Sequence, residues 1–180
     1  NKTYTLLISV DGKIYTAKAS MTPGSTVGEL VYNRKEDEDL YYVDWVANAF
    51  STGPAAMWEL LIDWSRVPGY TQLDSADNHA RMLFYTLPTL DVSEIFAPMM
   101  QSVYFPAGTI ITERRYSLTP LHAEFMRGML LETNWTGGLF PIAAANVATN
   151  MSEGAYGYFG ACAVSQLSVT VEEKNRLKNK

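Results

Sequence analysis

Residues 156–171 carry the pattern that most restricts how this chain can fold. The first half of the stretch is almost continuously apolar, and in the second half Leu167, Val169 and Val171 alternate with polar residues. Alternation with a period of two, rich in β-branched residues, is typical of a half-buried strand. A segment apolar on both sides suits a strand inside a sheet that is covered on both faces. The stretch predicts one long strand, or two strands joined at Gly160.

Residues 3–20 predict a β-hairpin. Two β-prone runs, about 4–10 and 13–19, flank the pair Asp11-Gly12. This pair tolerates the positive φ angles of a tight hairpin turn. The signal is local, so it depends on no knowledge of the rest of the fold.

Several further elements follow from spacing. Strands are expected over 81–87 and 109–118. A helix is expected over 54–64, because Met57, Leu60, Leu61 and Trp64 fall on one helical face behind Pro54. A second helix is expected from Pro120 to about residue 132, with Thr119 as N-cap and with an apolar stripe of Leu121, Phe125 and Met129. A short helix after Ser93 is the third.

These elements favour a mainly β fold, an antiparallel β-sandwich of which a jelly roll is one form, with two or three short helices in its connections. An α+β fold is the alternative. We expect residues 1–180 to form a single domain, with the charged segment 33–39 as the best candidate link and 174–180 as a basic tail. Long aromatic-rich connections between strands give a layout that resembles viral coat and spike subunits.

The composition favours a protein that associates with others. Hydrophobic residues make up 47% of the chain and charged residues only 18%, against about 25% in a typical soluble domain. Protein interfaces favour Tyr, Trp, Phe and Met and are depleted in Lys and Glu. The net charge of −5 argues against a general polyanion binder, so contact with nucleic acid is expected at most through the tail residues Lys174, Arg176, Lys178 and Lys180.

The sequence predicts neither a catalytic nor a metal or cofactor site. It has no phosphate-binding loop, dinucleotide fingerprint or EF-hand loop. Cys162 is expected to be a buried, inert thiol, because no histidine or cation lies near it in sequence. His79 is read as a loop residue. Glu59 and Asp63 would share a face of the expected helix, which makes them the first carboxylates to inspect. No apolar run is long enough for a membrane-spanning helix.

Three functional hypotheses follow. The first is a structural subunit of a self-assembling particle of the capsid, spike or filament type, whose partners are copies of itself or other structural subunits and whose setting is a virion or extracellular. The second is a carbohydrate-binding or adhesion module that stacks a glycan on exposed aromatic rings. The third is a hydrolase with a carboxylate or histidine centre. The residues expected to contact a partner or ligand are Trp135, Tyr156, Tyr158, Trp45 and Trp58.

Overall fold

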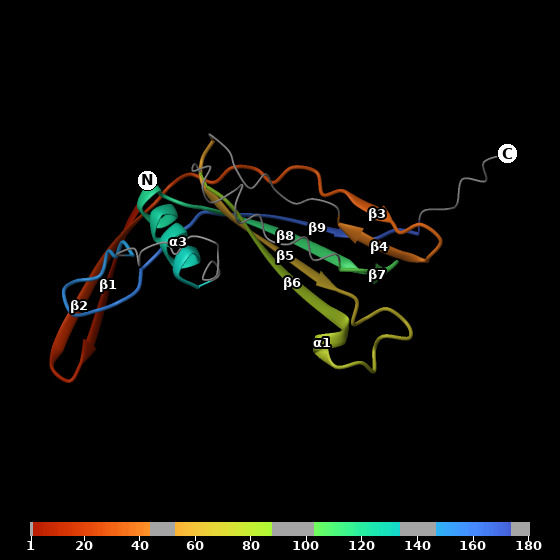
Figure 1. Cartoon of the computed structure of the whole chain (residues 1–180), viewed down its shortest axis with the longest axis horizontal. Coiled ribbons are helices and arrows are strands. Elements are labelled where there is room, and N and C mark those ends of the chain that lie inside the picture. Colours follow the sequence, from red (N-terminus) through yellow and green to blue (C-terminus); the bar gives the residue numbers. More distant parts are fainter. Residues whose placement is uncertain (1, 44–52, 88–102, 134–146, 174–180) are drawn as a thin grey trace, which may run out of the picture.

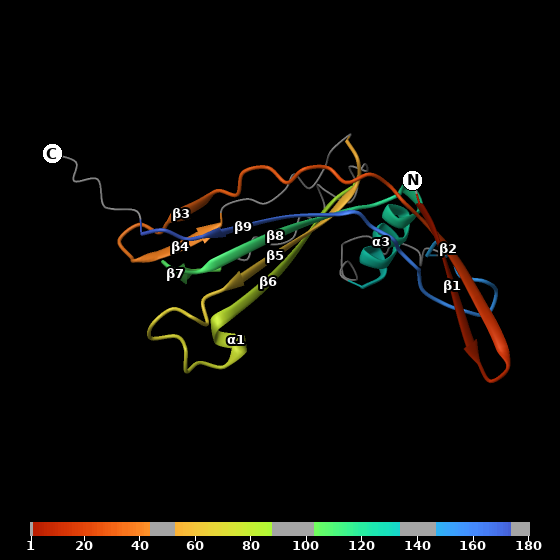
Figure 2. The ribbon, with the colours of Figure 1, turned by 180° about the vertical axis from the view of Figure 1, so that it is seen from behind.

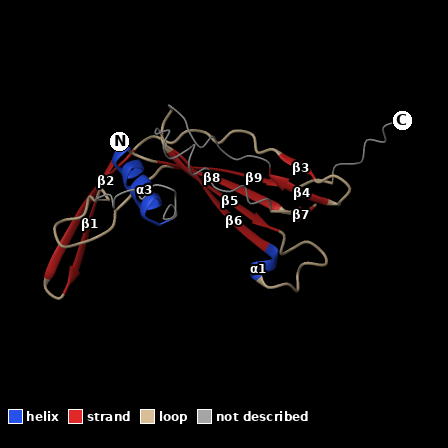
Figure 3. Ribbon diagram, viewed as in Figure 1, coloured by secondary structure: helices blue, strands red, loops and turns tan. Residues whose placement is uncertain are grey.

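The computed structural model describes residues 2–43, 53–87, 103–133 and 147–173. It is a mainly β protein built from antiparallel strands, with two helices in the described part (Figure 1, Figure 3). The predicted mainly β, antiparallel class is confirmed. The short helix expected after Ser93 lies outside the described residues. The sandwich arrangement stays a prediction, as do the single domain and its link.

The predicted hairpin is present. Strands β1 (Lys2–Val10) and β2 (Lys13–Met21) pair in antiparallel register and form a two-stranded sheet of their own. Asp11 and Gly12 make the turn with φ angles of 49° and 77°, as a primed hairpin turn requires. The hairpin projects from one end of the molecule in both views (Figure 1, Figure 2).

A four-stranded sheet forms the centre of the molecule, in the order β6-β5-β8-β9. Its strands are β5 (Ala56–Asp63), β6 (His79–Thr86), β8 (Ile110–Ser117) and β9 (Val164–Thr170). The short helix α1 (Ser75–Asn78) precedes β6. The strands expected over 81–87 and 109–118 are confirmed as β6 and β8.

The helix expected over 54–64 is wrong, because this segment contains strand β5. Its apolar spacing fits a helix, but β5 lies between β6 and β8 and pairs with both along its whole length. Leu60 and Ile62 are fully buried on the core side of the sheet, and Glu59 lies on the other side. This segment is therefore a strand because it pairs with two strands that are distant in the sequence, although its local spacing of apolar residues also fits a helix.

A three-stranded sheet lies beside the end of the central sheet that is farthest from the hairpin. It has the order β3-β4-β7, with β3 (Tyr32–Arg34), β4 (Leu40–Val43) and β7 (Phe105–Pro106). Tyr41 and Phe105 from this sheet pack with Leu60, Ile62 and Ile111 from the central sheet in the main core cluster. The two sheets are thus joined through apolar side chains.

Helix α3 (Pro120–Thr133) confirms the second expected helix, but its buried stripe is not the predicted one. Leu121 and Met129 are exposed, whereas Ala123, Met126 and Leu130 are buried with Leu87 and Leu118 in a second cluster. The helix has apolar residues on more than one face, and packing against Leu87 and Leu118 buries the face of Ala123, Met126 and Leu130 instead of the predicted one.

The long strand expected over 156–171 is only half correct. β9 begins at Val164, and residues 156–163 are irregular. The predicted alternation within β9 holds, because Leu167 and Val169 pack against the core while Gln166 and Ser168 are exposed. Residues 156–163 pack near helix α3 instead, where Tyr158 stacks on Phe125.

Candidate association surface

The hairpin exposes an unusual number of large apolar side chains for its size. Leu7 and Ile14 are each 68% exposed. Three more from β1 are also exposed, namely Tyr4, Ile8 and Val10. Scattered apolar residues on a surface are normal, but a contiguous group of them marks an interaction site.

The two faces of the hairpin differ in chemistry. The register pairs Leu6 with Ala17 and Ile8 with Tyr15, so these residues share one face. This apolar face also carries Tyr4, Val10 and Ala19. The opposite face is mostly threonine, serine and lysine, apart from Leu7 and Ile14. This alternation gives the hairpin one apolar face and one mostly polar face.

Only the β2 half of the apolar face is covered by the rest of the chain. Ala17 and Ala19 are buried, and Ala17 forms an isolated β-bridge with Met151. Ser152 exchanges two hydrogen bonds with the backbone of Thr16, one through its own N–H and one through its hydroxyl. The β1 half remains exposed, and no strand among the described residues pairs with the outer edge of β1.

Asn150 fixes the segment that holds β2. Its side-chain amide donates to the carbonyls of Lys18 and Phe159, each at 2.8 Å, and its side-chain oxygen accepts from the Phe159 N–H at 2.9 Å. One side chain thus ties the hairpin to the chain 132 positions later. This anchoring leaves β1 as the free side of the hairpin.

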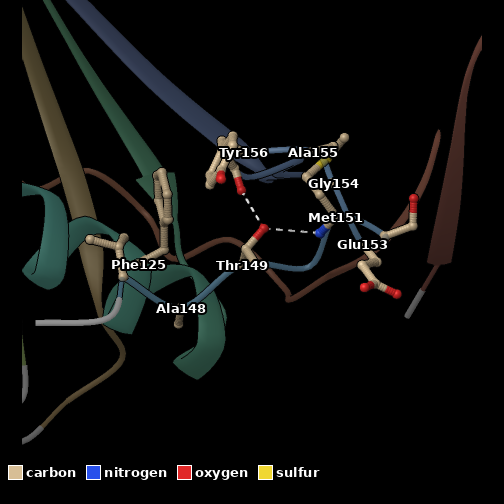
Figure 4. Close-up of a pocket in the computed structure, with 11 residues that line it drawn as sticks. Phe125, Ala148, Thr149, Met151, Glu153, Gly154, Ala155 and Tyr156 are labelled. Carbon is tan, nitrogen blue, oxygen red and sulfur yellow. Dashed lines mark hydrogen bonds between the residues drawn. The ribbon is translucent and has the colours of Figure 1, made fainter.

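A pocket of about 560 Å³ lies beside the hairpin, between Phe125 of α3 and residues 147–157 (Figure 4). The Thr149 hydroxyl donates to the Gly157 carbonyl and accepts from the Met151 N–H, so it is used in shaping the loop. Tyr156, one of the residues predicted to contact a ligand, lines the pocket and is 98% exposed. Its ring is available to a partner or ligand.

Tyr158 and Trp58 are already engaged within the chain. The Tyr158 ring stacks on the rings of both His122 and Phe125, at centroid distances of 4.8 and 5.0 Å. Trp58 donates from its indole N–H to the Thr86 hydroxyl, and the Arg115 guanidinium lies 5.0 Å from its ring centroid. Trp45, Trp135 and the tail residues Lys174, Arg176, Lys178 and Lys180 lie outside the described residues.

The fold brings Cys162 next to a histidine, which sequence proximity did not indicate. The Cys162 Sγ lies 3.6 Å from His122 Nδ1, although the residues are 40 positions apart. Burial raises the pKa of the Cys162 thiol and lowers the pKa of His122. Both groups are therefore held in their neutral forms, which is the opposite of what a thiolate nucleophile needs.

The carboxylate of Glu59 is occupied by hydrogen-bond donors on the solvent face of the central sheet. The Tyr116 hydroxyl donates to it at 2.7 Å, Arg81 at 2.7 Å and Arg114 at 3.3 Å. The Tyr116 hydrogen bond, together with those from the two arginines, lowers the pKa of Glu59 against the effect of burial. Such a carboxylate is a poor general base.

His79 and Asp63 are also brought together. His79 is the first residue of β6 and not part of a loop, and its Nε2 lies 3.2 Å from Asp63 Oδ1. The Asp63 carboxylate also accepts from the Ser65 hydroxyl at 2.6 Å. Glu59 and Asp63 share a face, as predicted, but along a strand and with separate partners.

Within the described ranges, no group of three histidine, cysteine or acidic side chains is arranged to hold a metal ion. No helix in that part of the chain is long and apolar enough to cross a membrane. No family model, curated protein or solved structure matches this chain.

Proposed function

We propose that the chain is a structural subunit of a self-assembling particle, of the capsid, spike or filament type, and that the β1–β2 hairpin is its contact arm. The observation that carries the proposal is the row of exposed apolar side chains on a hairpin that projects from the body. A virion or an extracellular setting goes with this function.

The energetic argument starts from the hairpin alone. An isolated two-stranded hairpin is at best marginally stable in water. Burying a large aliphatic side chain contributes about 1.5–3 kcal/mol, and Ile8 and Val10 on the apolar face are still 38% and 50% exposed. Contact with another subunit therefore stabilises both the assembly and the arm itself.

The open edge of β1 offers a second source of affinity. A strand with unpaired N–H and C=O groups can accept a strand from another chain, and native proteins usually protect such edges. β1 carries Lys2 at its beginning, but no proline or other charged residue along its length. Its sequence thus has few of the features that discourage pairing.

The test is the mass of the purified chain in solution, measured by analytical ultracentrifugation and native mass spectrometry over a concentration series. We expect oligomers that dissociate in the double variant Ile8→Thr with Val10→Thr, because both residues lie on the exposed part of the apolar face and threonine keeps the strand propensity but removes apolar area. Val164→Thr is the matched control, since Val164 is a β-strand residue 52% exposed outside the hairpin. A wild-type chain that stays monomeric at high micromolar concentration contradicts the proposal.

A glycan-binding function is the second candidate, and the fully exposed ring of Tyr156 beside the pocket is the observation that favours it. Aromatic rings at the edge of a pocket are suited to stack on sugars. A glycan array probed with the wild type and with Tyr156→Ala tests it. We expect hits that the variant loses, and an array without hits, or with the same hits for both proteins, contradicts this function.

A further inference from the structure

We infer that the hairpin of one copy docks on the opposite, acidic end of a second copy, so that subunits join head to tail. This inference rests on the proposed function and adds the partner and the direction of the contact. It follows from the distribution of charge and apolar area along the molecule.

The hairpin end is basic. Lys2, Lys13 and Lys18 are all exposed, against the single acid Asp11. None of the three lysines has an acidic partner within salt-bridge distance among the described residues. The hairpin is therefore a cationic arm on a chain whose net charge is −5.

Among the described residues, the opposite end, which we call the distal end, is acidic. The four cations of residues 174–180, which follow Glu173 in the sequence, lie outside the described residues. The distal end comprises the β3–β4 turn, the loop that holds α1 and the end of β9 (Figure 1). Its exposed acids are Glu36, Asp37, Glu38, Asp39, Asp74, Asp77, Glu172 and Glu173. Arg34 and Lys35 pair with Asp39 and Glu38, and Arg66 in the loop before α1 is exposed. No described cation lies within salt-bridge distance of Glu36, Asp37, Glu172 or Glu173.

The distal end also offers apolar surface to the hairpin. Val31, Leu73 and Tyr104 are between 42% and 54% exposed there. The Tyr104 ring lies edge-on to Tyr42 and has the Lys35 ammonium 4.4 Å from its centroid. The exposed aliphatic side chains of the hairpin thus meet a surface that can bury them.

Charge and geometry together select a head-to-tail contact. Two hairpins placed against each other would bring lysines together, and like charges across an interface disfavour a complex. The two surfaces lie at opposite ends of one molecule in both views (Figure 1, Figure 2), so they cannot meet within a single chain. A contact between two different surfaces is heterologous, and it produces a ring if the rotation closes and a filament if it does not.

The experiment reverses charge at each end separately. The arm variant carries Lys13→Glu with Lys18→Glu, and the distal variant carries Glu36→Lys with Glu172→Lys. Each is expected to weaken self-association roughly tenfold, because single exposed charge pairs contribute modestly and each variant replaces attraction by repulsion at two positions. An equimolar mixture of the two variants is expected to regain association, since the reversed charges then complement each other.

The matched control is Glu124→Lys with Glu153→Lys, two exposed acids outside the distal end. It changes the net charge as much as the distal variant does, and we expect it not to weaken association. Circular dichroism and thermal melting establish that all the variants are folded. The readout for each is the dissociation constant from sedimentation.

The outcomes separate the two proposals. If the wild type forms oligomers and the distal variant associates equally well, the head-to-tail contact is wrong while the proposed function stands. If the mixture of the arm and distal variants fails to regain association, the pairing of these two ends is wrong as well. If the wild type is monomeric throughout, the proposed function itself fails.

Discussion

Glu113 gives the sharpest quantitative prediction, because its carboxyl group is buried on the core side of strand β8. The residue is only 4% exposed, and its register partners on the two neighbouring strands are Leu60 and Leu167. Burial raises the pKa of Glu113 from 4.5 to about 7. Arg115 lies two residues further along the same strand, and its guanidinium is placed over the ring of Trp58.

The sign of the pH dependence follows from which state holds the proton. Below the ordinary pKa of 4.5, the carboxyl is neutral in both the folded and the unfolded chain, and its burial carries no ionisation cost. As the pH rises toward 7, the unfolded chain releases this proton while the folded chain retains it. The free energy of unfolding therefore falls by about 1.4 kcal/mol per pH unit over this window, or about 3 kcal/mol in total, and the loss is complete once the pH exceeds the folded pKa.

The perturbation is Glu113→Gln, which keeps the shape and removes the ionisable group. Relative to the wild type, the variant should gain about 3 kcal/mol of unfolding free energy as the pH rises from about 4 to about 8. Urea denaturation followed by tryptophan fluorescence at a series of pH values measures it. Parallel pH profiles for the two proteins would show that the Glu113 carboxyl is not buried as described.

Three further predictions concern packing, hydrogen bonding and charge. Gly160→Ala should destabilise the fold by about 1–3 kcal/mol, because an added Cβ would lie 2.5 Å from the His122 ring. The control Gly28→Ala, whose added Cβ would have no atom within 4 Å, should be nearly neutral in the same denaturation assay. Equal effects of the two substitutions would contradict the packing around Gly160. Glu59→Gln should lower the unfolding free energy by about 1–2 kcal/mol, since its three donors lose a charged acceptor, and an unchanged denaturation midpoint would show that the network contributes nothing. Removing residues 174–180 takes away four cations that follow Glu173 in the sequence. Self-association measured by sedimentation should then tighten and become more sensitive to salt. Weaker association would contradict the proposal that the acids of the distal end attract the hairpin.

The elements that could be predicted from the sequence are those whose signals are local. The hairpin depends on Asp11-Gly12 and on the runs beside it, and α3 on the Thr119-Pro120 start. Strand β5 could not be recognised, because its spacing also fits a helix and only β6 and β8 on either side settle the matter. A strand of this kind is specified by neighbours that lie far away in the sequence.

The proposed association surface was predictable only in part. Composition predicted that a partner covers some of the surface, which stays a prediction, and Tyr156, one of the residues named for such a contact, is fully exposed. Composition did not locate the surface on the hairpin, because the same alternation of apolar residues would also suit a hairpin packed on a core. The short distance between Cys162 and His122 could not be predicted from the sequence either, because it depends on how α3 packs against residues 156–163.

The anchoring of β2 by residues 150–152 limits how this small sheet can grow. The side of β2 away from β1 is already occupied by the chain's own backbone at Met151 and Ser152. In the proposed assembly, a foreign strand would therefore join the hairpin next to β1, where no described strand pairs. Each arm would then accept a single strand, which would favour ordered growth of the assembly over unlimited extension of the sheet.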